Sequence, residues 1–369
     1  MVKIVYISGS RSDYFLMKRT LMELNEKFNL TIIATSMHLS SMFGYTVELI
    51  EKDGFKVEKV DMLFDNDSLS AMAKSFGIGV YGIAQIMEKI KPDVILVGGD
   101  RGESLAGAIV GAHLNIPVAH HSGGDLSSSI DNKIRYAITS FSDFHLVGNS
   151  KSYEKLISIG ISAENLFCVG EPGLDDIKSK NFSSKETIVK KYDINPKEPF
   201  IILLQHPNTD EFEETEKNII ETLNAIKELK IQTIAIYSNS DSGGKLINNK
   251  IDEYSHNFNF INCFANIERG DFLGLINVCD LMVGNSSSGI IELPSFKKPF
   301  VYVGTRQENR IISGNVINVD YNKQEIIDGI KKALYDVKFR AELKNIKNPY
   351  GDGNSSQRIV KTILNIMGI

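Results

Sequence analysis

Asp280-Leu-Met-Val-Gly284-Asn-Ser-Ser-Ser-Gly289-Ile-Ile-Glu292 decides the fold, because it joins a short apolar run to a polar turn and then to the start of a helix. Small polar residues at a strand-to-helix turn bring backbone N–H groups together, and the helix start adds positive partial charge. Such a turn binds anions. Glu292 would lie about one turn into the helix, where a carboxylate can accept hydrogen bonds from two sugar hydroxyls. The alternative is a Ser-capped helix with a surface glutamate.

Length and composition narrow the class of protein. The 369 residues predict two domains, and 42% hydrophobic with 24% charged residues is typical of a soluble globular chain. The net charge of −5 predicts no general attraction to nucleic acid or to anionic membranes. The cysteines, which stand singly, predict reduced thiols. With no signal-peptide core and no run of about 18 apolar residues, we expect a cytoplasmic protein without membrane spans.

The first half of the chain alternates apolar strand patterns with helical patterns. Strands are expected at 2–7, 30–35, 57–60, 94–97, 116–119 and 144–147, and helices at 69–91 and 102–113, among others. Strands that alternate with helices at this spacing predict crossover connections and a parallel sheet. A polar segment with weak apolar periodicity follows Gly170-Glu-Pro-Gly173, and we place the domain boundary there.

The second half repeats this alternation. Strands are expected at 199–204, 231–237, 260–263, 281–283, 299–303 and 316–319, and helices at 210–229 and 355–367, among others. The predicted fold class is α/β, with two Rossmann-like domains that face each other across a cleft. The predicted domains are 1–172 and 173–352, followed by a C-terminal helix at 353–369.

Several strand-end turns are rich in polar side chains, and ligands of parallel sheets bind at the carboxyl ends of strands. The candidate residues on these turns are Arg11, Asp100, Arg101, His120, Asp125, Asp131, His206 and Asn239. Each has a structural alternative: Asp100 and Arg101 can form an ordinary ion pair, and Asp131 can cap a helix. Their concentration at one kind of position favours a site with anion-binding and proton-transferring groups.

Metal and cofactor motifs are missing from this sequence. His120 and His121 are adjacent rather than four residues apart, and there is no HExxH, so we expect no metal site. The chain has no GxxxxGK[ST] motif and no complete GxGxxG, so we expect no P-loop and no dinucleotide cofactor. A nucleotide-activated substrate is the better interpretation.

The ordered motifs resemble those of the hydrolysing UDP-N-acetylglucosamine 2-epimerases. They are Gly9-Ser-Arg-Ser-Asp-Tyr14, Met37-His-Leu39, Gly99-Asp-Arg101, His120-x-x-Gly-Gly-Asp125 with Asp131, Arg135-Tyr-Ala-Ile-Thr139, Gln205-His-Pro207, Gly284-Asn-Ser-Ser-Ser-Gly289 with Glu292, Gly304-Thr-Arg-Gln307 and Gly351-Asp-Gly-Asn354. The resemblance implies a GT-B architecture whose last helix returns to the first domain, and a homo-oligomer. It also implies release of UDP and N-acetylmannosamine, usually as a first step toward sialic acid.

The reaction that the resemblance implies is elimination of UDP to a 2-acetamidoglucal, followed by hydration. Ser286 and Ser287 would hold the diphosphate, Glu292 the ribose, and Arg11 would supplement them. His206 would protonate or hydrogen-bond the leaving phosphate.

The remaining implied roles concern proton transfer and orientation. Asp100 and Asp131 are candidates for proton transfer at C2 and for handling water, and His120 is a third catalytic candidate. Arg101, Arg306 and Asn239 are expected to bind or orient the substrate.

Two positions depart from the family. Asp125 stands where the family usually has Glu, so the carboxylate is kept but is shorter by one methylene. Ser122 stands where the family commonly has Glu or His, and a serine needs an activating partner to act as a base at neutral pH. Either His120, His121 or Asp131 takes over, or this position is not essential here.

Other functions stay open at this point. They are a related enzyme for a UDP- or GDP-linked diacetamido sugar, a non-hydrolysing 2-epimerase, a glycosyltransferase, and an inactive sugar-nucleotide sensor.

Overall fold

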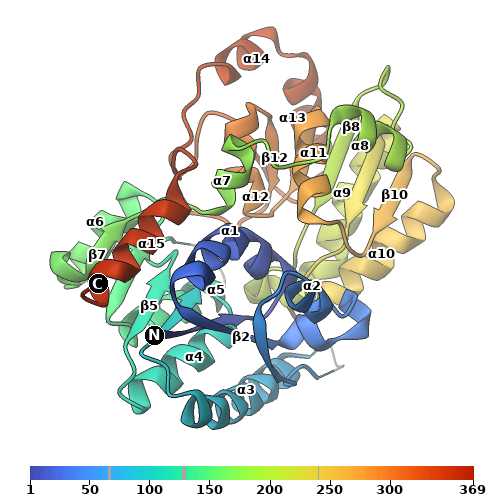
Figure 1. Ribbon diagram of the computed structural model, residues 1–369. Coiled ribbons are helices and arrows are strands. Elements are labelled where there is room, and N and C mark those ends of the chain that lie inside the picture. Colours follow the sequence, from blue (N-terminus) through green and yellow to red (C-terminus); the bar gives the residue numbers. More distant parts are fainter. Residues whose placement is uncertain (65–67, 127–129, 240) are drawn as a thin grey trace. The chain divides into compact units, whose positions relative to one another are not determined.

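A computed structural model of the protein describes residues 1–64, 68–126, 130–239 and 241–369 (Figure 1). The chain divides into two compact units. The first unit comprises Met1–Leu126, Ile130–Ser179 and Tyr350–Ile369, and the second comprises Lys180–Pro349. Each unit is an α/β structure around one parallel sheet, so the predicted fold class is confirmed.

The first unit is built on a seven-stranded sheet in the order β3-β2-β1-β4-β5-β6-β7. Its strands are β1 (Lys3–Ser8), β2 (Asn29–Thr35), β3 (Lys56–Val60), β4 (Val94–Gly98), β5 (Val118–His121), β6 (Phe144–Val147) and β7 (Leu166–Cys168). Every recorded pairing in it is parallel. The edge strand β7 was not predicted, because three residues carry too little apolar pattern.

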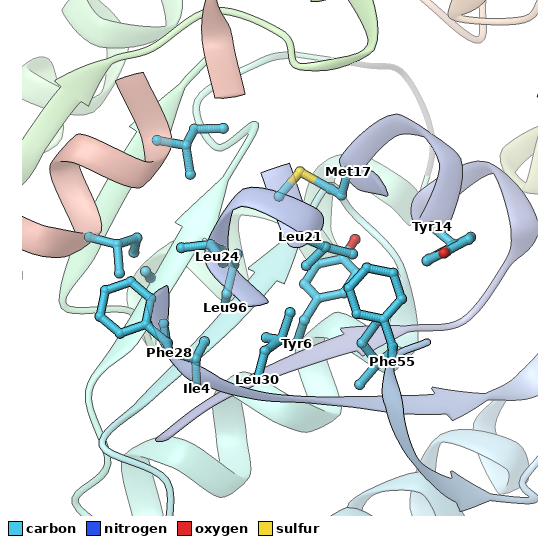
Figure 2. Close-up of a cluster of buried hydrophobic side chains, with 14 of the residues drawn as sticks. Ile4, Tyr6, Tyr14, Met17, Leu21, Leu24, Phe28, Leu30, Phe55 and Leu96 are labelled. Carbon is cyan, nitrogen blue, oxygen red and sulfur yellow. The ribbon is translucent and has the colours of Figure 1, made fainter. Parts of the chain in front are cut away.

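Helices connect these strands. They are α1 (Arg11–Lys27), α2 (Val47–Lys52), α3 (Leu69–Ile90), α4 (Gly102–His113), α5 (Ile130–Ser140), α6 (Ser150–Ser158), α7 (Gly173–Lys178) and α15 (Ser355–Ile366), with 3-10 turns η1 (Ser36–Leu39), η2 (Ser41–Phe43) and η3 (Ala163–Asn165). α1 begins at a cap in which the Ser10 hydroxyl accepts a hydrogen bond from Asp13 N at 3.3 Å. Figure 2 shows its apolar side chains against the sheet: Met17, Leu21 and Leu24 with Ile4, Tyr6, Leu30 and Leu96.

The last helix, α15, folds with the first unit. Its N-terminus is held by Asp175 of α7, whose carboxylate accepts hydrogen bonds from Ser355 N at 2.9 Å and Ser356 N at 2.7 Å. Thr20 of α1 donates to the Ser356 hydroxyl at 2.9 Å. These contacts explain why the first unit continues through α7 and resumes at Tyr350.

The second unit has a six-stranded parallel sheet in the order β10-β9-β8-β11-β12-β13. Its strands are β8 (Phe200–Leu204), β9 (Gln232–Ile236), β10 (Ile261–Phe264), β11 (Leu281–Gly284), β12 (Phe300–Val303) and β13 (Val316–Val319). The connecting elements are α8 (Lys185–Lys191), η4 (Thr209–Glu214), α9 (Thr215–Leu229), α10 (Gly244–Asn257), α11 (Arg269–Val278), α12 (Ser288–Ile291), η5 (Leu293–Phe296), α13 (Lys323–Tyr335) and α14 (Val337–Leu343). The expected helix at 210–229 begins as the 3-10 turn η4, because Glu211 has non-helical backbone angles.

Strand order reverses once in each sheet. In the first unit β1 lies between β2 and β4, and in the second unit β8 lies between β9 and β11. Chain segments leaving neighbouring strands at such a reversal turn to opposite faces and open a crevice at the carboxyl ends of the strands, where open α/β sheets bind ligands. The predicted polar turns after β1 and β4, and after β8 and β11, therefore occupy the binding position of each sheet.

Candidate active site

The turn after β11 is locked to the turn after β8. Gly284 has φ 128°, and a Cβ placed on it would lie 2.2 Å from the Leu204 carbonyl oxygen, so only glycine allows this approach. Asn285 is fully buried, and its side chain accepts from His206 N at 2.7 Å and donates to His206 O at 2.9 Å. Its own carbonyl accepts from Gln307 Nε2 at 3.2 Å. The strand-end turn thus fixes the backbone of His206.

The His206 ring has a defined tautomer. Its Nδ1 accepts a hydrogen bond from the backbone N–H of Asn239 at 3.3 Å, and the Ser238 hydroxyl lies 3.2 Å from the same atom. A nitrogen that accepts cannot carry the proton of the neutral ring, so Nε2 carries it. His206 is therefore set to donate a hydrogen bond from Nε2.

Two serines of the turn offer backbone donors. Within the described part of the chain, the N–H groups of Ser286 and Ser287 have no protein acceptor, and the Ser286 hydroxyl accepts from Ser288 N at 3.4 Å. α12 begins at Ser288 and has four residues before the chain tightens into η5. Glu292, expected about one turn into this helix, directly follows its last residue, and Pro294 lies in the first turn of η5. Any anion affinity of this turn therefore comes from the N–H groups and hydroxyls more than from a long helix dipole.

Glu292 is buried, with 2% of its surface exposed, and its carboxylate forms an ion pair with Arg269, the first residue of α11. The partner is itself largely covered, so the pair is shielded from water. A buried carboxylate held by a guanidinium has a fixed position. The sequence did not predict Arg269, which lies on a different helix.

Arg306 and Asn239 share one carboxylate. The Arg306 guanidinium lies 3.7 Å from Asp241 Oδ2, and Asn239 Nδ2 donates to the same oxygen at 2.6 Å. Arg306 is 8% exposed. Both predicted residues are thereby held at the carboxyl end of the second unit's sheet, next to the turn that bears His206.

In the first unit, Asp100 is paired with Arg135 of α5. Arg135 has only 1% of its surface exposed, ion-pairs with the Asp100 carboxylate and donates from Nη1 to the Asp125 carbonyl at 2.9 Å. Asp100 keeps 24% of its side chain accessible. The buried arginine therefore orients a carboxylate that still reaches the surface of the sheet edge.

Asp131 lies in the first turn of α5, one turn before Arg135 on the same helix. Asp125, by contrast, is buried and serves the start of α6: its carboxylate accepts from Asn149 Nδ2 at 2.9 Å and from the Ser152 hydroxyl. The shorter carboxylate at this position thus has a structural function.

His120 is fully buried between two partners. Its Nε2 lies 2.8 Å from the Gly99 carbonyl and its Nδ1 lies 3.2 Å from the Thr139 hydroxyl. Burial lowers the pKa of His120 to about 3. A neutral ring that donates to Gly99 and accepts from Thr139 satisfies both contacts, so His120 holds the backbone next to Asp100.

The two predicted arginines of the first unit begin helices. Arg11 is the first residue of α1, and Arg101 is the N-cap residue of α4. Arg101 Nε lies 3.4 Å from Glu103 Oε2. Burial raises the pKa of nearby Asp13 to about 6, although Arg101 opposes this change.

The predicted residues divide between the two units. Arg11, Asp100, Arg101, His120 and Asp131 belong to the first, and His206, Asn239, Ser286, Ser287, Glu292 and Arg306 to the second. The sequence missed the positioning roles of Arg135 and Arg269. Arg135 could have been found from its spacing of four residues after Asp131 on one helix, whereas no local signal connects Arg269 with Glu292.

The described residues contain neither a metal-binding group of side chains nor a membrane-spanning helix. No group of three or more His, Cys, Asp or Glu side chains there could hold a metal ion. No helix in the described ranges is long and apolar enough to cross a membrane.

Known proteins resemble this chain over most of its length. The family model described as UDP-N-acetylglucosamine 2-epimerase matches residues 21–364. The UDP-N,N'-diacetylbacillosamine 2-epimerase (hydrolyzing) of Legionella pneumophila is 38% identical, covering 98% of this chain and 96% of that protein. A UDP-N-acetylglucosamine 2-epimerase of Neisseria meningitidis serogroup B is 32% identical over 93% of this chain and 90% of that protein.

A solved structure supports the fold. The crystal structure of a UDP-GlcNAc 2-epimerase from Neisseria meningitidis, bound to UDP-GlcNAc, superposes with a TM-score of 0.83 at 20% identity, covering 99% of this chain and 100% of that one. The family match spans most of the chain, and the curated relatives are similar over nearly their full length. This chain therefore belongs to the UDP-N-acetylglucosamine 2-epimerase family.

Proposed function

We propose that the protein is a hydrolysing 2-epimerase that converts UDP-N-acetylglucosamine to N-acetylmannosamine and UDP. The observation that carries this proposal is the Asn285 clamp, which holds a His206 ring with its proton on Nε2 beside a turn with unused N–H donors. A histidine that donates next to an anion-binding turn suits a leaving diphosphate. Family membership supports the coarser statement, action on a UDP-sugar at C2.

The chemistry requires most help at the leaving group. The C2–H bond is hardly acidic in the ground state, so departure of UDP from C1 must lead and build the positive charge that acidifies C2. Interactions that strengthen as charge develops on the leaving phosphate lower the barrier. We assign this task to the second unit, where Ser286, Ser287 and the Nε2–H group of His206 bind the diphosphate.

Three further residues of the second unit orient the substrate. Glu292 accepts hydrogen bonds from the ribose hydroxyls, and its ion pair with Arg269 fixes the carboxylate for this task. Arg306 and Asn239, joined through Asp241, orient phosphate or sugar. Since Glu292 is 2% exposed, binding of ribose needs a close fit at this position.

The first unit supplies the proton-transferring groups. Asp100, oriented by Arg135, and Asp131, one turn earlier on the helix that carries Arg135, handle the C2 proton and water. His120 is a positioning residue that keeps the Gly99 backbone in place. Arg11 and Arg101 contribute positive charge for the phosphates.

A second candidate substrate is UDP-N,N'-diacetylbacillosamine. It is favoured by the 38% identity to the Legionella enzyme of that name, against 32% to a UDP-N-acetylglucosamine 2-epimerase. Both sugars carry a 2-acetamido group next to the UDP-bearing carbon, so the elimination and hydration steps are the same. The sugars differ in substituents remote from the reacting carbons.

Proton NMR in D2O tests the proposal with each nucleotide sugar in parallel. Free UDP together with a 2-epimerised sugar deuterated at C2 is the expected result, and comparison of kcat/KM between the two donors identifies the substrate. An epimerised sugar that still carries UDP would show the non-hydrolysing reaction. Binding without turnover would show a sensor, and either result would overturn the proposal.

We also propose that the protein works in the cytoplasm as a homo-oligomer and that its product enters sialic-acid-type synthesis. Cell fractionation and sedimentation velocity test the first two statements. Loss of cell-surface sialic acid in a deletion strain, restored by added N-acetylmannosamine, tests the third.

A further inference from the structure

Ser122, which directly follows β5, lies against the carboxylate of Glu171. Its Oγ is 2.8 Å from Glu171 Oε1 and 3.0 Å from Oε2, and it lies 2.9 Å from His121 Nδ1. An ionised carboxylate can only accept hydrogen bonds, so the serine hydroxyl donates to Glu171. The serine proton thus already points at a base.

The position of Glu171 depends on the surrounding backbone. Gly148 leaves room for the carboxylate, since a Cβ there would lie 2.2 Å from Glu171 Oε1. Glu171 N donates to the Tyr350 carbonyl at 2.8 Å. Glu171 is 8% exposed, whereas Ser122 is half-buried at the carboxyl end of β5. A substrate can therefore reach the buried carboxylate through the serine hydroxyl.

The backbone at Ser122 is strained. Its φ is 61°, a conformation that costs an L-residue about 1 kcal/mol or more and that glycine adopts freely. A serine in this conformation brings a hydroxyl to the carboxyl end of β5 at an energetic cost. Strain of this kind is a reason to look for function at the residue.

Ser122 also lies close to the proposed proton-transferring group. β4 and β5 are neighbours, with Gly98 paired to His121, and Asp100 and Ser122 follow these two strands at the same sheet edge. A second acid–base group beside Asp100 suits a reaction in which C2 loses a proton on one face and gains one on the other.

We propose that Ser122 and Glu171 form a proton relay for C2, with Ser122 as the catalytic residue and Glu171 as the base that acts through it. This inference rests on the proposed 2-epimerase reaction. The C2–H bond breaks and its electron pair forms the C1=C2 bond, while the C1–O bond breaks and UDP leaves with the electron pair of the C1–O bond. The C2 proton passes to Ser122 Oγ as the serine proton passes to Glu171, which becomes a neutral acid and later returns its proton to solvent.

Two variants test the relay in the full-length protein. Glu171→Gln keeps the shape and a hydrogen bond to Ser122 but removes the base, and Ser122→Gly removes the hydroxyl while relieving the positive φ. Loss of general-base catalysis lowers rates by about 100- to 10,000-fold. We expect each variant to lose kcat in this range for UDP release, with unchanged UDP affinity and no loss of thermal stability.

An isotope effect separates proton transfer from a structural role. With substrate deuterated at C2, the isotope effect on kcat/KM should rise in both variants, because proton removal becomes more rate-limiting. Formate should restore part of the activity of Glu171→Ala by supplying the missing carboxylate. Asp175→Asn is the matched control, a buried carboxylate four residues away that caps α15; it should lower the melting temperature and keep the wild-type isotope effect.

The outcomes are distinguishable. If the wild type releases UDP and Glu171→Gln does so equally fast, or more slowly with an unchanged isotope effect, the relay is wrong and the proposed function stands. If the wild type releases UDP from neither nucleotide sugar, the proposed function is wrong and the relay falls with it.

Discussion

Asn285→Ala removes the clamp that holds His206. Asn285 is fully buried, and its amide is the partner of both the N–H and the C=O of His206. A buried donor or acceptor left without a partner costs about 1–3 kcal/mol. Two such groups give roughly 2–4 kcal/mol, toward the lower end of the sum because His206 is half-exposed and water can reach it.

The activity of Asn285→Ala should fall more than its stability loss alone explains. The clamp sets the direction of the His206 ring toward the leaving phosphate, and a displacement of about 1 Å in a catalytic group can cost about 100-fold in rate. We expect kcat for UDP release to drop by about 10- to 100-fold. Hydrogen exchange of peptides from β8 and β11 measures the local stability, and a coupled UDP assay measures the rate.

Asn315→Ala provides the comparison. Asn315 is equally buried in the same unit, and its amide donates to the carbonyls of Gly289 and Lys298, each at 3.1 Å. Asn315→Ala should lower the free energy of unfolding about as much as Asn285→Ala does, with a much smaller change in kcat. Wild-type exchange in β8 and wild-type UDP release in Asn285→Ala would refute the assignment of the clamp.

Three further predictions follow from packing, charge and pH. Gly284→Ala should lose several kcal/mol of stability or fail to fold, since its Cβ would overlap the Leu204 carbonyl at a φ of 128°; a melting temperature within about 2 °C of the wild type would contradict this. Arg135→Met should cost about 3 kcal/mol and lower kcat at least tenfold, because it removes the buried guanidinium that orients the Asp100 carboxylate; denaturant unfolding and UDP release check both values, and an unchanged kcat would contradict the positioning role. Burial lowers the pKa of His38 to about 4, so the unfolded state binds more protons than the folded state between about pH 6.5 and 4. The free energy of unfolding therefore falls as the pH drops through that window. His38→Gln should reduce this pH dependence, measured by denaturant unfolding, by up to about 1.4 kcal/mol per pH unit, and an equal slope in both proteins would contradict the prediction.

The sequence predicted the strands and the polar turns well because both are local signals. Continuous apolar runs such as Ile4–Ile7 and the turn at Gly284 depend on neighbouring residues only, and strand alternation gives the parallel sheet. Two predictions suffered where the local signal is weak. The strand β7 was missed because it has only three residues, and the helix that begins after Ser287 ends before Pro294.

The ion-pair partners of the site residues could not be predicted, since they depend on which helices the sheet brings together. Arg269 and Glu292 lie on different elements, and Arg135 reaches Asp100 from the helix after the next strand. The turn residues of Gly170-Glu-Pro-Gly173 predict a domain boundary and give no sign of a site residue. In the structure its glutamate, Glu171, accepts a hydrogen bond from Ser122. The two residues are 49 positions apart, and no apolar periodicity in the sequence predicts such a contact.

The return of α15 to the first unit has a consequence for biosynthesis. Ile359 and Ile363 belong to the same apolar cluster as Leu21 and Leu24 of α1. On the ribosome, α1 is made long before α15, so this part of the first unit's core stays uncovered until the intervening chain and α15 have emerged. The nascent chain therefore exposes an apolar helix face throughout translation, which makes it a natural client for chaperones that shield such surfaces.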